Sequence, residues 1–131
     1  MERRIINPWT YQDRAGFVQA SEITGVDRIV VCSGQASVDS EGTPEYPGDI
    51  VAQVHQTLDN IETVLAGAGM TLADVVRLNY YTTDMDAMVG AFVSYRERLA
   101  DAGCHPSSSL LGVTALGIPG LMVEIEATAM A

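Results

Sequence analysis

Apolar residues recur at helical spacing in two stretches of the chain. In residues 49–69 they fall three or four positions apart and form one stripe: Val51, Val54, Leu58, Ile61 and Leu65. This period predicts an amphipathic helix. Asp49, which follows Pro47-Gly48, can cap the start of the helix, and Gly69 is placed to end it in a left-handed turn.

The second stretch, residues 86–103, predicts another helix, with Gly103 as its stop. One side of this helix is apolar and carries Met88, Phe92, Tyr95 and Leu99. Its exposed face is expected to carry Arg96, Glu97 and Arg98.

Five segments have the composition of strands. Residues 16–23 and 27–34 flank Thr24–Val26 and predict a hairpin. Residues 75–83, 108–116 and 121–130 predict three more strands, the last with strict alternation of apolar and polar positions. The order strand-strand-helix-strand-helix-strand-strand predicts two helices on one face of a mixed sheet. A partner subunit is the natural cover for the other face.

Composition narrows the classes of partner. The 131 residues predict one domain, residues 1–131, and 47% apolar against 18% charged residues favours self-association. A net charge of −10, with seven basic and 17 acidic residues, argues against nucleic acid and anionic membrane surfaces. No stretch approaches the ~20 apolar residues of a membrane span, and the start of the chain lacks a signal-peptide pattern. We therefore expect a cytoplasmic protein with no membrane contact, whose two cysteines are reduced thiols.

Several residues of types that act in catalysis or bind metals lack the partner residues that these roles require. Ser33 has no histidine at a spacing typical of a catalytic triad. His55 on the first helix is read as a solvated or interface residue. His105 adjoins Cys104, but adjacent side chains point apart, and Cys32 is distant in sequence, so no metal site is expected.

Glu124 and Glu126 lie on the same face of the last strand. Two interpretations remain open for them. They can be solvated residues at the edge of a sheet, or one of them can be a carboxylate in a subunit cleft that acts as a general acid or base or orients water.

The chain resembles the YjgF/Rid (reactive intermediate deaminase) family from Gly16 to its end. The most specific matches are Ser-Gly-Gln at 33–35, "QTLDNI" in the first helix and the closing "VEIEA". The resemblance implies the chorismate-mutase-like α+β fold and a homotrimer with three clefts between subunits. Family members with the deaminase activity hydrolyse enamines and imines to a keto acid and ammonia, and they need no cofactor.

In the family, an arginine after the proline of an "RPAR"-like stretch grips the substrate carboxylate. Here Pro106 matches the proline, and the arginine position falls on Ser108. Position by position, the resemblance implies a cleft lined by six residues: Phe17, Ser33, Phe92, Ser108, Leu110 and Glu124. Four other arginines could replace the missing charge: Arg14, Arg77, Arg96 and Arg98.

The resemblance therefore implies an enamine or imine hydrolase whose substrate lacks an α-carboxylate. Glu124 would hold the water, while Ser108 and Ser33 would orient the ligand. The alternative is a non-catalytic protein that binds a small, fairly neutral metabolite. An endoribonuclease function, named for some relatives, is disfavoured by the acidic charge.

Overall fold

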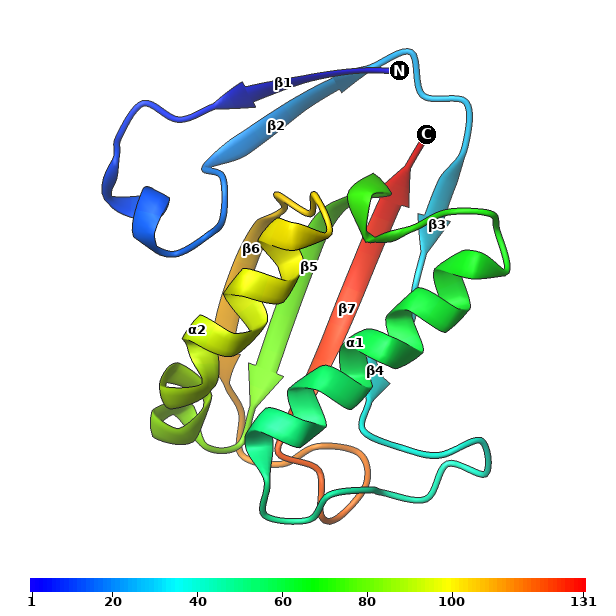
Figure 1. Cartoon of the computed structure of the whole chain (residues 1–131), viewed down its shortest axis with the longest axis vertical. Helices are drawn as coiled ribbons and strands as arrows, with labels where there is room; N and C mark the ends of the chain where they lie inside the picture. Colours follow the sequence, from blue (N-terminus) through cyan, green and yellow to red (C-terminus); the bar gives the residue numbers. More distant parts are fainter.

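The computed structural model describes residues 1–131 and contains seven strands and two α-helices (Figure 1). In chain order these elements are β1 (Glu2–Ile6), β2 (Ala20–Thr24), β3 (Ile29–Val31), β4 (Gln35–Ala36), α1 (Ile50–Ala66), β5 (Val75–Thr82), α2 (Met85–Asp101), β6 (Ser107–Gly112) and β7 (Val123–Met130). Short 3₁₀ turns cover Tyr11–Arg14 and Leu72–Asp74.

The main sheet has the order β3-β7-β5-β6, and β4 also pairs with β7. β5 and β6 run parallel, whereas β3, β4 and β5 each pair with β7 in antiparallel fashion, so the sheet is mixed as predicted. In this register Tyr80 of β5 lies between Ile125 of β7 and Leu110 of β6. Side chains alternate between the two faces along each strand, so these three residues face the same side.

The predicted hairpin between residues 16–23 and 27–34 is wrong. β2 instead pairs with β1, a strand that the sequence pattern did not identify, and the two form a separate ribbon. β3 joins the edge of the main sheet beside β7. The backbone N–H groups of Asp27 and Arg28 both donate to the carbonyl of Ala131 at 2.9 Å, so the turn after β2 is bound to the end of β7. Pairing with the long central strand therefore replaces the local hairpin.

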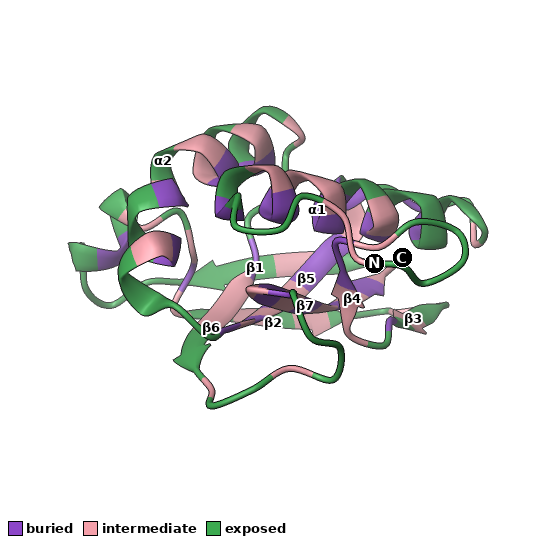
Figure 2. Cartoon of the chain, turned by 90° about the horizontal axis from the view of Figure 1, so that it is seen from below, coloured by how far each residue is buried: buried purple, intermediate pink, exposed green.

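Both helices pack on the same face of the main sheet, as predicted (Figure 2). The ends of the helices have the predicted caps. The Asp49 side chain accepts a hydrogen bond from the N–H of Ala52 at 3.0 Å. Gly69 and Gly103 follow the two helices with φ of 68° and 71°, conformations that glycine adopts without a steric penalty. No helix combines the length and apolar character that crossing a membrane requires.

The hydrophobic core lies between the helices and the sheet. The predicted stripe of α1 supplies Leu58, Ile61 and Leu65, which are fully buried. The strands supply Leu78 and Ile125, also fully buried. The polar residues of β5 and β7 face the opposite side, which the chain itself does not cover with a helix (Figure 2).

The predicted exposed face of α2 is only partly correct. Glu97 is exposed, but Arg96 and Arg98 are half-buried. Arg98 donates to the carboxylates of Asp59 and Glu62 on α1, which draws it against the neighbouring helix. Arg96 turns the other way, toward a pocket.

Candidate functional site

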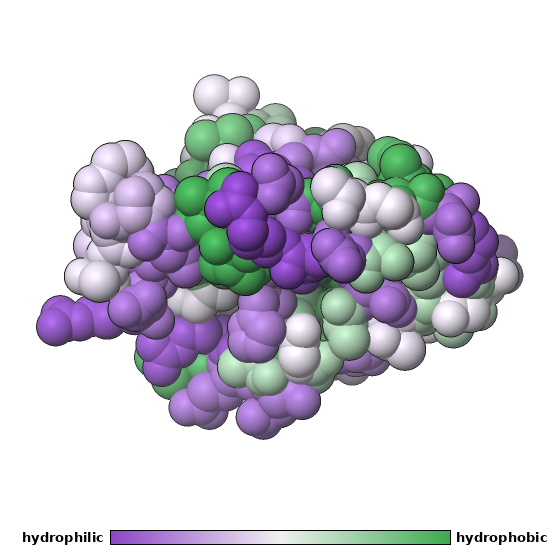
Figure 3. Space-filling view, turned by 90° about the horizontal axis from the view of Figure 1, so that it is seen from above, coloured by the Kyte–Doolittle hydropathy of each residue, from purple (hydrophilic) through white to green (hydrophobic).

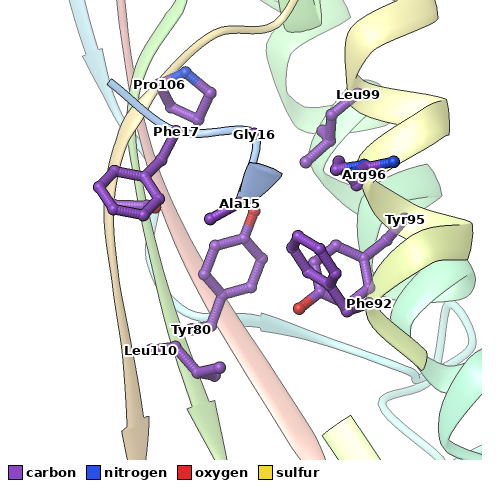
Figure 4. A pocket seen from close by; sticks show the side chains of 11 residues that line it. Ala15, Gly16, Phe17, Tyr80, Phe92, Tyr95, Arg96, Leu99, Pro106 and Leu110 are labelled. Atoms are coloured by element: carbon purple, nitrogen blue, oxygen red, sulfur yellow. The ribbon is translucent and has the colours of Figure 1, made fainter. Parts of the chain in front are cut away.

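A pocket of about 270 Å³ opens between α2, the strands β5 and β6, and the segment 15–17 (Figure 4). Four of the six predicted site residues line it: Phe17, Phe92, Ser108 and Leu110. Most of the lining is apolar, because aromatic and aliphatic side chains make up its walls. Concave, mostly apolar pockets with a few polar groups are typical of small-molecule sites.

The register of the sheet places Ser108 and Leu110 in this pocket. They occupy alternate positions on β6, opposite Leu78 and Tyr80 of β5, and therefore face the helices. Phe17 is brought to the same place because the N–H of the next residue, Val18, donates to the carbonyl of Pro106 at 3.0 Å. This bond joins the segment after the first 3₁₀ turn to the start of β6.

The other two predicted residues, Ser33 and Glu124, lie outside this pocket. Glu124 is on β7, where it alternates with Ile125 and therefore faces the side of the sheet that carries no helices. Its carboxylate lies against Gly34 and borders a separate hollow of about 160 Å³. Ser33, next to Gly34, is exposed. The chain thus separates Glu124 and Ser33 from the other four predicted residues, and Glu124 lies on the opposite face of the sheet.

The two acids of β7 have different surroundings. The Tyr81 hydroxyl donates a hydrogen bond to Glu126, and this bond raises the pKa of Tyr81 above its usual value. The carboxylate of Glu124 accepts no hydrogen bond within the chain, so it remains available to water or a ligand. Beside them, Arg77 donates to Ser109 at 2.9 Å on the same face, well away from the pocket.

Among the other residues that line the pocket are two tyrosines that were not identified as site residues, Tyr80 and Tyr95, and Arg96, which was only one of four candidate replacements for the missing charge. The rings of Tyr80 and Tyr95 are 5.7 Å apart between centroids, and Phe92 packs edge-on against Tyr95 at 5.6 Å. The sequence holds a usable signal for Tyr80, since it occupies the same face of β5 as the buried Leu78 and Thr82, which lie two positions before and after it. Tyr95 was assigned only to the apolar side of its helix, because periodicity does not distinguish a core position from a pocket wall.

Arg96 is the only one of the four candidate arginines whose side chain lines the pocket. Its guanidinium lies over the Phe92 ring, 5.5 Å from the centroid, and donates to the carbonyl of Arg14 at 2.7 Å. The bond to Arg14 joins the end of the first 3₁₀ turn to α2, whereas Phe92 lies on the same helix as Arg96. Arg96 therefore shapes the pocket mouth and also brings a positive charge to it.

His55 and Ser94 form the one close histidine–serine pair, at 2.5 Å between Nε2 and Oγ. Arg98 lies 3.2 Å from His55 Nδ1, and because a guanidinium can only donate, Nδ1 is the acceptor. Nε2 therefore carries the hydrogen and donates a hydrogen bond to the Ser94 Oγ. This arrangement stabilises the contact between the helices and does not activate the serine as a nucleophile.

The cysteines are buried free thiols. Burial raises the pKa of Cys104 to about 12, so this thiol stays protonated at neutral pH. No group of three His, Cys, Asp or Glu side chains lies close enough together to hold a metal ion.

Comparisons with known proteins place this geometry in a family. The sequence profile described as Endoribonuclease L-PSP matches residues 11–131. The 2-iminobutanoate/2-iminopropanoate deaminase of Escherichia coli is 29% identical over 111 residues, covering 82% of this chain and 85% of that protein. A RutC family protein of Haemophilus influenzae is 34% identical over 91 residues, covering 70% of this chain and 66% of that protein.

Solved structures share the fold. The crystal structure of YyfB from Yersinia pestis, a Rid family protein, has a TM-score of 0.89 and 36% identity, and each chain is fully covered. The E. coli YjgF structure has a TM-score of 0.70 and 28% identity over 87% of each chain. These matches confirm the predicted fold, with two helices packed on one face of a mixed sheet. By sequence profile, by relatives and by fold, the chain belongs to the YjgF/Rid family.

Proposed function

We propose that this protein is a Rid-type hydrolase that converts a small enamine or imine without an α-carboxylate to a carbonyl compound and ammonia. The observation that carries the proposal is the apolar pocket in which Ser108 occupies the position that the family resemblance assigns to the carboxylate-binding arginine. The name of the E. coli relative supports the reaction type.

The site is completed by a second copy of the chain. Glu124 lies on the face of the sheet opposite Ser108, and no side-chain rotation brings it through the sheet, while Ser33 lies in the loop between β3 and β4, outside the pocket. A neighbouring subunit that supplies Glu124 and Ser33 to the pocket would join the two groups. In the proposed homotrimer each of the three clefts forms in this way.

Exposed apolar side chains support such an assembly. On the face that carries the β1–β2 ribbon, apolar side chains reach the surface among hydrophilic ones (Figure 3). Ile5 on β1 and Val31 on β3 are 42% and 76% exposed in the single chain. Their burial between subunits would contribute about 25 cal/mol for each Å² of apolar surface removed from water.

In the proposed reaction, Glu124 orients a water molecule toward the imine carbon and accepts one of its protons. As the water oxygen bonds to that carbon, the C=N double bond becomes a single bond and the nitrogen takes up the proton from Glu124, which gives a carbinolamine. The new hydroxyl group then loses its proton to the nitrogen, and the C–N bond breaks. Ammonia leaves and the carbon becomes a carbonyl group. The reaction consumes one water and transfers no electrons, so it requires no redox cofactor.

Ser108 makes a substrate carboxylate unfavourable at this position. Hydrogen bonds that involve a charged group contribute about 1.5–3 kcal/mol each, and a buried charge left without them costs more. A serine hydroxyl donates one neutral hydrogen bond. A neutral group on the substrate therefore fits better against Ser108 and the apolar wall around it.

The alternative remains a non-catalytic protein that binds a small neutral metabolite in the same pocket. An endoribonuclease activity is not supported, because a net charge of −10 repels the phosphates of RNA. Ammonia release distinguishes hydrolysis from binding alone.

The test compares Glu124→Gln with Glu126→Gln in an ammonia-release assay on neutral imines and on 2-iminopropanoate. We expect the wild-type protein to prefer neutral imines, Glu124→Gln to abolish turnover, and Glu126→Gln to retain most of it. Light scattering should give a trimer for all three proteins. A stable monomer, or a silent Glu124→Gln beside a damaging Glu126→Gln, would contradict the proposed site.

A further inference from the structure

Two tyrosines of the pocket carry hydroxyl groups that no protein group satisfies. Tyr80 and Tyr95 are only 6% and 5% exposed, yet neither hydroxyl makes a hydrogen bond within the chain. No buried side-chain oxygen or nitrogen is both unpaired and fully sealed from solvent, so each of these hydroxyls has access to open space. Both residues line the pocket, which is the open space available to them.

A buried tyrosine whose hydroxyl makes no hydrogen bond within the chain is unusual. A buried hydroxyl is ordinarily satisfied, because leaving it unpaired costs free energy. A phenylalanine at either position would fill the same volume without that cost. Tyr81, the next residue on β5, shows the ordinary arrangement, since its hydroxyl donates to Glu126 on the other face.

Both hydroxyls act as donors over the whole neutral range. Burial raises the pKa of Tyr95 to about 12 and raises that of Tyr80 further. The groups thus keep their protons and offer O–H to an acceptor. A ligand oxygen that accepts from them is favoured over a ligand that presents only donors.

We propose that the hydroxyls of Tyr80 and Tyr95 are ligand-binding groups, and that they select small apolar molecules that carry a carbonyl oxygen. The proposal rests on the proposed function only in taking this pocket as the ligand site. It names the chemistry of the molecule bound there: a flat apolar body with at least one oxygen acceptor.

The positions of the side chains fit that description. In Figure 4 the two hydroxyls project in different directions from neighbouring rings, so they provide two separate donor points. Phe92 packs against Tyr95, and Leu110 is the cross-strand neighbour of Tyr80, so both donors stand beside apolar surface. A carbonyl compound can place its oxygen on one donor while its apolar part remains on these side chains.

The experiment measures binding of acetophenone and of ethylbenzene by NMR titration. The two molecules are similar in size, and only acetophenone carries a carbonyl oxygen. The proteins are the wild type, the double variant Tyr80→Phe/Tyr95→Phe and the control Tyr46→Phe, whose ring is half-exposed on a distant loop. The double variant is required because acetophenone can use either donor.

We expect the double variant to bind acetophenone about 2- to 12-fold more weakly than the wild type, the effect of one neutral hydrogen bond. Ethylbenzene should bind equally well or more tightly, and Tyr46→Phe should change neither. The melting temperature of the double variant should be unchanged or higher, because no internal hydrogen bond is lost.

Two results would overturn the inference. One is a parallel loss of affinity for both molecules, which would make the hydroxyls indifferent to the carbonyl. The other is a melting temperature lowered by several degrees, which would make the hydroxyls structural. Neither measurement needs turnover, so a protein that binds acetophenone selectively but releases no ammonia would contradict the proposed reaction and leave this inference standing.

Discussion

Replacing Gly34 with alanine should test the role of Glu124 without removing its carboxylate. A Cβ atom at position 34 would lie 1.9 Å from Oε1 of Glu124, 2.7 Å from Cδ and 2.9 Å from Cγ. Contacts below 3.0 Å essentially never occur for a real Cβ, so Oε1 must move by at least the difference, 3.0 − 1.9 = 1.1 Å. The glycine has an ordinary φ, so the substitution strains the side chain of Glu124 and not the backbone.

The expected effects on stability and on catalysis differ in size. Turning a half-buried side chain away from its preferred rotamer costs about 0.5–1.5 kcal/mol, so Gly34→Ala should fold and assemble normally. A displacement of about 1 Å at a reacting group can lower a rate by about 10²-fold. We therefore expect ammonia release to fall by about two orders of magnitude while the free energy of unfolding changes by about 1 kcal/mol.

The assay is ammonia release from a neutral imine, with urea denaturation and light scattering on the same samples. Gly117→Ala is the matched control, because Gly117 borders the same hollow as Glu124 and a Cβ there meets no atom within 4 Å. Its turnover should equal that of the wild type. Wild-type turnover in Gly34→Ala, with Glu124 displaced in a crystal structure, would refute the assignment of Glu124 to the reaction.

Three further predictions concern the core, the buried thiol and the pocket wall. Leu58→Ala removes a fully buried side chain and should lower the free energy of unfolding by about 2–5 kcal/mol in urea denaturation, whereas Val89→Ala, at a 59% exposed position, should cost far less. Because burial raises the pKa of Cys104 from 9.0 to about 12, the folded chain keeps a proton that the unfolded chain loses above pH 9. The free energy of unfolding should therefore be unaffected by this thiol below pH 9 and should fall by up to about 1.4 kcal/mol per pH unit above pH 9. In urea titrations between pH 8 and 10, Cys104→Ala should flatten this pH dependence. Ser108→Arg should bind pyruvate at least about 10-fold more tightly than the wild type, since a guanidinium can form charge-assisted hydrogen bonds with the carboxylate. Calorimetry measures both affinities, and equal values would show that position 108 does not face the ligand.

The elements with strong periodicity could be predicted from the sequence. The stripe through Leu58 and Leu65 and the alternation around Ile125 produce one helix and one strand with nearly the predicted bounds. The prediction failed for β1, which was not identified, and for the pairing partner of β2. A short turn between two strand-like segments predicts a hairpin by local criteria, but the long strand β7 offers β3 a better partner. Pairings between distant segments depend on the whole sheet, and no local pattern encodes them.

The candidate site could also be predicted only in part, because some of its residues are brought together by pairing between distant segments. The family resemblance named Phe17, Phe92, Ser108 and Leu110, and the structure brings these four together in one pocket. Alternation along β5 could assign Tyr80 to the buried face, but not to the pocket, because the sequence pattern does not reveal that β6 runs parallel to β5 and places Leu110 beside it. Arg96 was one of four candidate replacements for the missing charge, but helical spacing assigned it to the exposed face of α2, so its place at the pocket was not predicted.

Strand alternation explains why one chain holds the two parts of the site apart. Tyr80 faces the pocket and Tyr81 faces Glu126, so two adjacent residues of β5 serve opposite faces of the sheet. A shift of one residue in the register of β7 would exchange Glu124 with a core residue, and burial of that core fixes the register. The hydrophobic core therefore holds Glu124 on the face without helices and away from its own pocket. A carboxylate that the fold holds on that face, with no hydrogen-bond partner in its own chain, is available to the pocket of a second copy, which is the arrangement that the proposed trimer requires.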